Sequence, residues 1–430
     1  MRKPTRIVPD GIGDRIPGPG HDQYPTSPLG ERVKGIPTGR DVEWQPLVDY
    51  RRFGISETTI HGAVAWATGP SKGRPGRVIH SFGGNVLCYG RSMMKPLVMK
   101  VFAEELADCS WEQKAIAQSS HNGDTEHVAA AQSLLHETEW GLMQAPLELP
   151  LVPFGRTVRR PRRWYHPCSG EHAAILHGCK AKGWPRIGYL LPQHPWFQAY
   201  LDHVRSVLGK GWEPLRIARD GCGLPTLSNT VNELAVLYAN LAATKDKDWV
   251  WEAYQRNPDL VGGFNRLDTT ILKSCGGKVV AKEGADGLLG LAIEHPDYPD
   301  GLGVVIKIAH GWNPRATWYV ARSILGVLGF RVRNPYPLTR QKAFIVPGVV
   351  PARYLKDLEG IASWDEWDPD TDRWYYDWSE YVGSQQLMRG HDDGPNSEAG
   401  EAGRMGRRKT GSPRSPESLF GSEPGRGGDA

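Results

Sequence analysis

Two patterns of apolar and polar positions, one typical of strands and one of helices, alternate along the middle of the chain. The stretch from Gly301 to Ala309 is a short, nearly continuous apolar run, which is typical of a buried strand. From Val231 to Ala243 the apolar residues recur every three to four positions, which predicts a helix. The stretch from Lys278 to Ala281 again has a strand-like pattern. This mixture predicts an α+β (mixed α/β) enzyme domain.

The pattern fades toward both ends and divides the chain into four parts. Residues 1–50 are rich in Pro and Gly and predict a disordered N-terminal extension. Residues 51–335 predict the catalytic domain, and residues 336–386 an aromatic-rich appendage that packs on it. Residues 387–430 are dominated by Gly, Ser, Pro, Arg and Glu, so we expect a disordered tail. No internal repeat is evident.

Composition narrows the class of protein. The chain has 430 residues, and its 52 basic and 48 acidic residues leave a net charge of only +4, which gives no reason to expect nucleic acid as the main partner. No apolar stretch is long enough to span a bilayer, and Pro and Gly interrupt the first twenty residues, so we expect neither a signal peptide nor a membrane partner. Six scattered cysteines favour free thiols or metal ligands in the cytoplasm.

The most informative short pattern is the one Ser-x-x-Lys of the chain, which joins Ser92 to Lys95. Apolar residues at helical spacing from Leu97 to Leu106 follow it, so we expect Ser92 at a helix start with Lys95 on the same face. A lysine desolvated there can lose its proton and act as the base for the serine hydroxyl. Alone, the pattern fits an exposed pair at a helix start better than a catalytic pair.

Two further patterns support the catalytic interpretation. Ser120-His-Asn122 gives a Ser-x-Asn, and Lys282-Glu-Gly284 gives a Lys-x-Gly after the strand-like segment. Their order matches the three motifs of serine β-lactamases and penicillin-binding proteins. In such sites the second serine relays protons, and the second lysine keeps the site electropositive.

Several longer motifs occur in a specific order. They are Gly90-Arg-Ser-x-x-Lys-Pro96, Ser120-His121, Cys168-Ser-Gly-x-His172, Asp220-Gly-Cys-Gly-Leu-Pro-Thr226 and Lys282-x-Gly-Ala-Asp286. Together they resemble the rhizobial-type, thermolabile L-asparaginase II family, over roughly residues 54–335. The resemblance implies a fold similar to serine β-lactamases and glutaminases, with an antiparallel sheet flanked by helices.

The same resemblance implies an activity and a set of site residues. We expect hydrolysis of the side-chain amide of L-asparagine, or of a related small amide, with no organic cofactor. The implied catalytic residues form two Ser-Lys tandems, Ser92 with Lys95 and Ser120 with Lys282. The residues expected to bind or orient substrate are Arg91, His121, Asp220 and Gly284.

The family also has a zinc site built from two cysteines and a lysine. The cysteines correspond to Cys168 and Cys222, while the lysine position holds Glu171. A carboxylate is a more ordinary zinc ligand than an amine, so zinc at Cys168, Glu171 and Cys222 is an expectation. By spacing alone, two such thiols usually just pack. A second departure is Asp268, where some family members place another cysteine.

Other interpretations remain open. Glu171 and Asp268 would also suit an amide hydrolase or acyltransferase of the same fold that acts on a larger substrate. A penicillin-binding role and a non-enzymatic scaffold are weaker alternatives.

His172 is a further candidate for orienting the site, with a buried structural role as its alternative. The arginines at 156, 159, 160, 162 and 163 are best explained as a solvated basic loop. A homodimer is left open as the assembly.

Overall fold

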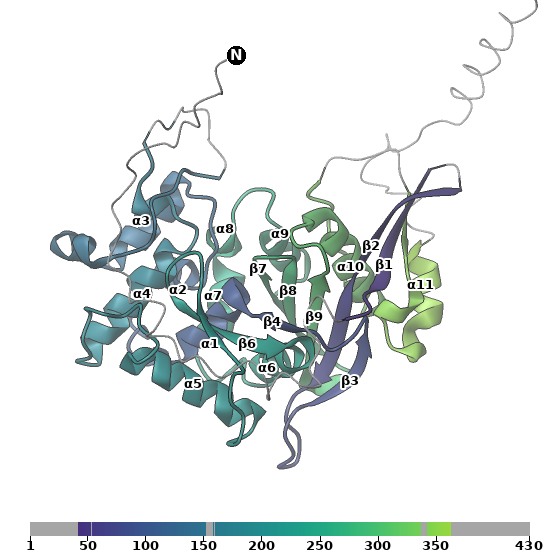
Figure 1. The fold of residues 1–430 in the computed structure, drawn as a ribbon, viewed down its shortest axis with the longest axis horizontal. Helices are drawn as coiled ribbons and strands as arrows, with labels where there is room; N and C mark the ends of the chain where they lie inside the picture. Colours follow the sequence, from purple (N-terminus) through teal and green to yellow (C-terminus); the bar gives the residue numbers. More distant parts are fainter. Residues whose placement is uncertain (1–41, 53, 152–157, 159, 337–341, 363–430) are drawn as a thin grey trace, which may run out of the picture. The chain divides into compact units, whose positions relative to one another are not determined.

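The structure is a computed structural model that describes residues 42–52, 54–151, 158, 160–336 and 342–362, all within one compact unit (Figure 1). Residues 1–41 of the expected N-terminal extension lie outside the described residues, as does the expected tail at 387–430. The aromatic run from Trp364 to Tyr381 also lies outside them.

A large antiparallel sheet forms the middle of the described part of the chain. Its strands follow the order β10 (Lys342–Ile345), β1 (Gln45–Arg52), β2 (Ile55–Thr68), β9 (Tyr298–Ile308), β8 (Leu288–His295) and β7 (Val279–Gly284), and β3 (Arg77–Phe82) also pairs with β2. A small second sheet has the order β4 (Leu87–Tyr89), β6 (Pro225–Thr230) and β5 (Ile217–Arg219). Every paired neighbour is antiparallel.

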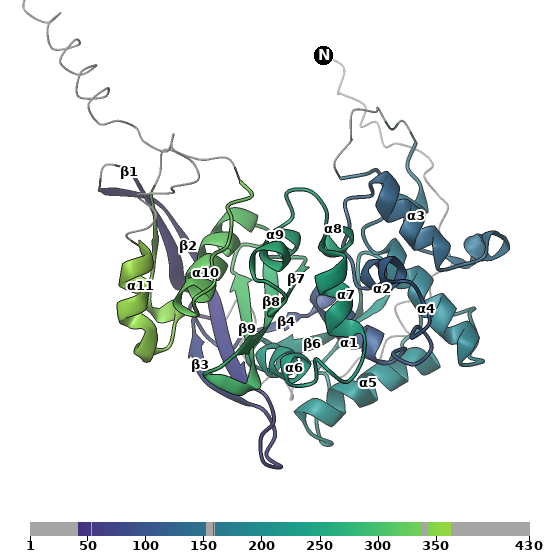
Figure 2. The same cartoon turned by 180° about the vertical axis from the view of Figure 1, so that it is seen from behind.

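Helices cover both faces of the large sheet and gather beside the small one (Figures 1 and 2). One face packs against α6 (Val231–Ala243), and the other against α9 (Leu267–Ser274), α10 (Pro314–Val327) and α11 (Leu355–Ala362). The remaining helices are α1 (Lys95–Lys100), α2 (Trp111–Ala117), α3 (Thr125–Ser133), α4 (Ser169–Ala181), α5 (Pro195–Leu208), α7 (Val250–Arg256) and α8 (Pro258–Val261). The site described below lies between these helices and β7.

Helix α6 illustrates how the sequence determines the packing. Thr230 and Glu233 form a capping box that fixes the first turn of the helix. Two glycines of the sheet, Gly290 and Gly303, lie beneath it, and a Cβ at Gly303 would overlap the carbonyl oxygen of Ala235. The helix and sheet backbones therefore approach more closely than any side chain would allow.

The predicted α+β class, with an antiparallel sheet flanked by helices, is confirmed. The helix expected at 231–243 and the strands expected near 278–281 and 301–309 are present. The further likeness to serine β-lactamases and glutaminases stays a prediction.

Some elements fall outside the expected domain limits. Strand β1 begins at Gln45, within the expected 1–50 extension, because Leu47, Val48 and Tyr50 are buried in the sheet. Strand β10 and helix α11 come from the expected 336–386 appendage and pack on the same sheet. The indole nitrogen of Trp66, for example, donates to the carbonyl of Val349 at 3.0 Å.

The helix expected after Ser92 is shorter than its apolar spacing suggests. Residues Arg91–Met94 form a single 3₁₀ turn, and α1 then ends at Lys100. Phe102 and Leu106 are nevertheless fully buried, in turns. The apolar spacing therefore predicted correctly which residues are buried, but it predicted too long a helix.

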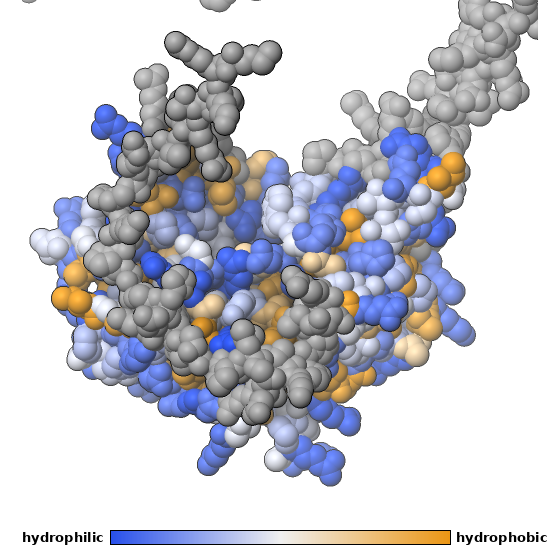
Figure 3. Space-filling model, viewed as in Figure 1, coloured by the Kyte–Doolittle hydropathy of each residue, from blue (hydrophilic) through white to orange (hydrophobic). Residues whose placement is uncertain are grey.

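Within the described ranges, no helix is long and apolar enough to cross a membrane. On the face shown in Figure 3, hydrophilic residues predominate and apolar residues occur in small groups. This surface agrees with the near balance of charges in the sequence.

Candidate active site

The turn that carries Ser92 is held on three sides. Its backbone is fixed to β6 by a bond from Gly90 N to Leu227 O (3.2 Å) and by one from Arg91 N to the hydroxyl of Thr226 (3.2 Å). From α6, the hydroxyl of Tyr238 donates to Met93 O at 2.6 Å. The turn is thus fixed by the small sheet and by the helix beneath the large one.

Arg91, just before Ser92, has a backbone φ of 50°, which is unusual for a residue with a side chain. Such a conformation costs roughly 1–3 kcal/mol and persists only where the surroundings impose it. Gly284 at the end of β7 closes the third side, because a Cβ there would lie 3.2 Å from Cβ of Met93 and 3.3 Å from Gly90 O. Gly284 therefore packs against the Ser92 turn, and it does not line the pocket described below.

The second serine lies between two buried lysines. Ser120 Oγ accepts hydrogen bonds from Lys282 Nζ at 2.9 Å and from Lys95 Nζ at 3.3 Å. Lys95 and Lys282 are 1% and 0% exposed, and Ser120 is 6% exposed. The two lysines of the predicted tandems thus meet at Ser120, although they come from distant parts of the sequence.

Lys95 does not bond Ser92 in this structure. Its ammonium donates to the carbonyl of Ser119 and to Ser120, and it lies 3.5 Å from a carboxylate oxygen of Glu171. The side-chain partner of Ser92 Oγ is Cys168 Sγ, at 3.8 Å. Ser92 thus lies in the 3₁₀ turn and Lys95 at the start of α1, and no direct bond joins the two side chains in the described contacts.

The two lysines differ in their electrostatics. Burial lowers the pKa of Lys282 to about 8, although Asp268 opposes that shift. Burial also lowers the pKa of Lys95, but the attraction of Cys168 and Glu171 outweighs it and leaves that pKa raised. Lys282 is thus the lysine that more readily releases its proton near neutral pH.

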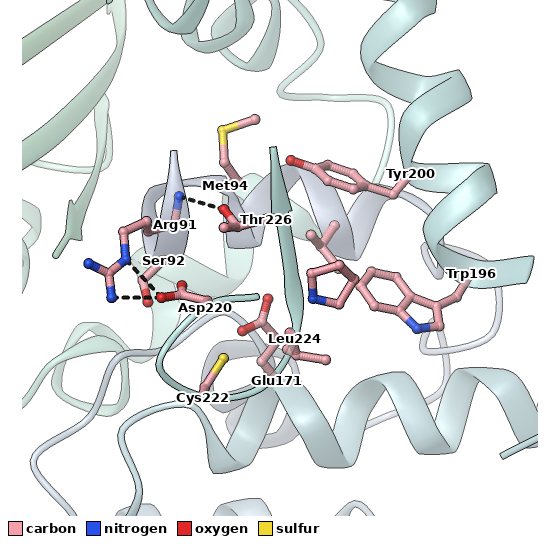
Figure 4. A pocket seen from close by; sticks show the side chains of 12 residues that line it. Arg91, Ser92, Met94, Glu171, Trp196, Tyr200, Asp220, Cys222, Leu224 and Thr226 are labelled. Atoms are coloured by element: carbon pink, nitrogen blue, oxygen red, sulfur yellow. Dashed lines mark hydrogen bonds and ion pairs between the residues drawn. The ribbon is translucent and has the colours of Figure 1, made fainter. Parts of the chain in front are cut away.

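Ser92 opens onto a pocket between α1, α4, α5 and the small sheet (Figure 4). The residues that line it are Arg91, Ser92, Met94, Val98, Glu171, Trp196, Tyr200, Asp220, Cys222, Leu224, Pro225 and Thr226. Figure 4 shows Arg91 and Ser92 beside Asp220, with the side chains of Trp196 and Tyr200 coming from one helix. The pocket therefore combines charged groups near the serine with an apolar wall.

The charged end of the pocket is built around Arg91. Its guanidinium pairs with Asp220, with Nε at 2.8 Å and one terminal nitrogen at 2.6 Å from Oδ1, and it also pairs with Asp286. Glu171 is 6% exposed, and burial raises its pKa to about 7 even though Lys95 opposes the shift. The pocket thus offers one guanidinium and two carboxyl groups, those of Glu171 and Asp220, to a substrate.

Two histidines singled out in the sequence lie away from the pocket lining. His121 is fully buried, with Nε2 2.9 Å from the hydroxyl of Ser169 and Nδ1 accepting from Gly123 N at 3.0 Å. His172 Nδ1 lies 2.7 Å from the hydroxyl of Tyr189, and burial lowers its pKa to about 3. Both imidazoles are neutral groups that support the fold around the site.

The expected zinc ligands lie near one another but are engaged with other groups. The thiols of Cys168 and Cys222 interact, and a hydrogen bond from Cys222 lowers the pKa of Cys168. Glu171 faces the ammonium of Lys95. Among the described residues, no group of three or more His, Cys, Asp or Glu side chains is arranged to hold a metal ion. Two thiols and a carboxylate are donors of the kind that zinc takes, and zinc binding stays a prediction.

Arg266 belongs to the site but was not found from the sequence. It donates to Ser120 O at 2.8 Å, and its Nε lies 3.0 Å from a carboxylate oxygen of Glu283. It therefore links the backbone of the second serine to the residue beside Lys282. No short motif marks it, because its partners are a main-chain carbonyl and a side chain seventeen positions away.

Of the basic loop, Arg156 and Arg159 lie outside the described residues. Arg163 donates to the carbonyl of Ala145 at 2.6 Å, and Arg162 lies over the ring of Tyr165, 5.9 Å from its centroid. These interactions are local, and neither arginine lines the pocket at Ser92.

An antiparallel sheet flanked by helices thus carries serine hydroxyls and buried lysines close to a pocket. Residues 48–347 match the family model described as L-asparaginase II, which covers most of the chain. The chain therefore belongs to the L-asparaginase II family, a family of asparaginase-like amidohydrolases, and the expected resemblance is confirmed over a slightly wider range. Comparison with curated proteins found no match.

Proposed function

We propose that this protein hydrolyses the side-chain amide of L-asparagine, or of a closely related small amide, with Ser92 as the nucleophile. The observation that carries the proposal is the Ser120 hydroxyl held between Lys95 and Lys282, next to a pocket that contains Ser92. Family membership supports amide hydrolysis as the reaction class.

In the first half of the reaction, Ser92 Oγ attacks the amide carbon and its proton passes to the lysine–serine cluster. Lys95 is the lysine nearest to Ser92 in sequence, but its raised pKa keeps it charged near neutral pH. It therefore accepts the Ser92 proton only as it passes its own proton through Ser120 to neutral Lys282, after a rearrangement on substrate binding that brings it into contact with Ser92. Ser120 then relays the proton between Lys95 and Lys282, since its hydroxyl already bonds both. The amide nitrogen takes up a proton and leaves as ammonia, and the acyl group stays on Ser92.

In the second half, water attacks the ester carbonyl. Lys282 is the proposed acceptor of the water proton through Ser120, because its pKa of about 8 lets it lose and regain a proton near neutral pH. The acid product leaves, and Ser92 regains its proton. No step requires an organic cofactor, and none is routed through a metal.

Recognition of an amino acid substrate needs partners for both of its charges. Arg91, at the mouth of the pocket, is the proposed partner of the α-carboxylate. Asp220 and Glu171 line the same pocket, and a carboxylate there suits an α-ammonium group. Since Asp220 already holds Arg91, it also fixes the direction of the guanidinium.

The test is an ammonia-release assay on L-asparagine, L-glutamine and a panel of larger amides, with the intact chain and with Ser92→Ala. We expect release from asparagine or a small analogue, and loss of activity by about 10³-fold or more in Ser92→Ala. Ser56→Ala is the control, because Ser56 is an exposed serine on β2. Equal rates of ammonia release by Ser92→Ala and by the intact chain would contradict the proposal.

A second candidate is hydrolysis or acyl transfer with a larger substrate. It is favoured by the apolar wall of the pocket, to which Met94, Val98 and Leu224 contribute. Turnover of larger amides, but not of asparagine, in the same panel would select this candidate. The chemistry at Ser92 would be unchanged.

We also propose that the protein works in the cytoplasm. All six cysteines lie in the described part of the chain, and all are free. Unpaired cysteines suit a reducing compartment. Localisation of a tagged full-length chain in its own cells would test this.

A further inference from the structure

We propose that Asp268 is a positioning residue that holds the ammonium of Lys282 against Ser120. The proposal deepens the function proposed above and rests on it. It gives a role to a fully buried carboxylate that the reaction steps above do not use.

Ser120 and Asp268 are both partners of the Lys282 ammonium. Lys282 Nζ lies 2.9 Å from Ser120 Oγ and 3.4 Å from Asp268 Oδ2, and both charged side chains are 0% exposed. A third bond, to the carbonyl of Glu283 at 2.8 Å, completes the contacts of the ammonium. Lys282 thus has one partner that belongs to the reaction and two that fix its position.

The carboxylate of Asp268 is itself held firmly. It accepts from Thr269 N at 2.9 Å and from Glu283 N at 3.5 Å, so both of its oxygens have backbone donors. Gly262 leaves the room for it, because a Cβ at Gly262 would overlap Asp268 Oδ1. A charge fixed in this way acts on its neighbour without first having to reorient.

Other charged groups also surround Lys282, and they do not replace Asp268. Lys95 and Arg266 oppose the charge on Lys282, and Glu283 favours it less strongly than Asp268 does. Glu283 is in addition bonded to Arg266, at 3.0 Å. The tyrosines whose pKa values the charge of Asp268 helps to raise are Tyr238, Tyr254 and Tyr336. Because these tyrosines remain neutral, they place no charge beside Lys282. Asp268 is therefore the carboxylate that most strongly retains the proton on Lys282.

The consequence is specific. Without the charge at position 268, burial and the nearby cations act on Lys282 with less opposition, and its pKa falls further. The lysine also loses one of its three contacts, so the distance to Ser120 becomes less well defined. A purely structural aspartate would affect stability without moving the titration of Lys282.

The experiment compares the intact chain with Asp268→Asn, using lysine labelled with ¹³C at Cε and NMR titration. The Lys282 signal is assigned by its loss in Lys282→Met. We expect this signal to titrate near pH 8 in the intact chain. In Asp268→Asn we expect a shift of about 1–2 pH units to lower values. We expect the part of the pH profile in which kcat/KM rises with pH to move to lower pH as well. We also expect kcat to be reduced and KM to change little.

The matched control is Asp259→Asn, which removes a carboxylate paired with Lys273 on the exposed surface of α8 and α9. It should leave the Lys282 titration in place. Should Asp268→Asn fail to fold, Asp268→Cys provides a second neutral residue for the same measurement. An unchanged Lys282 titration in the neutral variant would overturn the proposal. A shifted titration in a protein that hydrolyses no amide would support the role of Asp268 and contradict the proposed function.

Discussion

Ser120 is the residue on which the two halves of the candidate site converge. The motif comparison identified it together with Ser92, Lys95 and Lys282, because each belongs to a short pattern that stays intact in the sequence. The patterns did not predict that Lys95 bonds Ser120 and not Ser92. Such a bond depends on how α1 and the segment before α3 lie in space, which residue spacing does not encode.

Replacing Ser120 by Ala should lower kcat by about 10²–10⁴-fold while KM changes little, because the proton relay is lost and substrate contacts are kept. Steady-state ammonia release measures both constants. Ser119→Ala is the matched control, since the adjacent buried hydroxyl bonds only the carbonyl of Ile116 in the described contacts. Similar losses in both variants would contradict the relay and would point to a packing defect.

The pH dependence follows from Lys282. A lysine acts as a base only when neutral, and the pKa of this one is lowered to about 8 by burial. Therefore kcat/KM should rise with pH, by about tenfold per unit well below pH 8, and level off above it. A rate profile between pH 5 and 9.5 at constant ionic strength measures the limb. A rate that falls as pH approaches 8 would contradict a neutral Lys282 as the base.

Residues that the sequence missed share one property. Arg266 acts through the carbonyl of Ser120, and Tyr238 through the carbonyl of Met93. Contacts to main-chain atoms leave no pattern of residue types, so only the fold reveals them. His121 and Gly284 were found from motifs, but neither lines the pocket. Both contact the structure around it.

At the scale of the elements, the sequence predicted those whose pattern is strong and local. Helix α6 matches its predicted range because its capping box and apolar spacing agree. Local composition predicts an extension at the position of β1, because the residues upstream are rich in Pro and Gly. The pairing of β1 with β2 and β10 is visible only in the sheet. Long-range pairing therefore determined what local composition could not.

Replacement of Gly303 by Ala should destabilise the protein by about 1–3 kcal/mol, because the new methyl group must push α6 away from β9. The added Cβ would overlap backbone atoms of Ala235 and Ala239. Chemical unfolding measures the change. Gly141→Ala is the control, since no heavy atom lies within 4 Å of the position that its new methyl group would take. Equal stability of both variants would contradict the close approach of α6 to the sheet.

At the scale of the whole molecule, the described residues from the N-terminal side and from beyond residue 336 contribute to one sheet and its covering helices. Val349, Tyr354, Leu358 and Ile361 are all buried in the core on the α10 side. Trp66 stacks on Tyr354 with ring centroids 6.0 Å apart. The limits of the folded unit are therefore set by packing and not by the change of composition near residue 335.

A chain that ends at Pro335 should lose cooperative unfolding or precipitate, because the apolar surface of the sheet and α10 would be exposed to water. A chain that ends at Ala362 retains every contact described and serves as the control. Thermal melting followed by circular dichroism compares the two. A cooperative transition at the same temperature in both chains would contradict the inclusion of β10 and α11 in the folded unit.

The central claim is that Ser92 carries the acyl group during amide hydrolysis. Rapid quenching during turnover of L-asparagine, followed by peptide mass spectrometry, tests it most directly. We expect an aspartyl ester on the peptide that contains Ser92, absent in Ser92→Ala and longer-lived in Ser120→Ala. Ammonia release with the acyl group on another residue, such as Ser120 or Cys168, or with no acyl adduct in any variant, would contradict it.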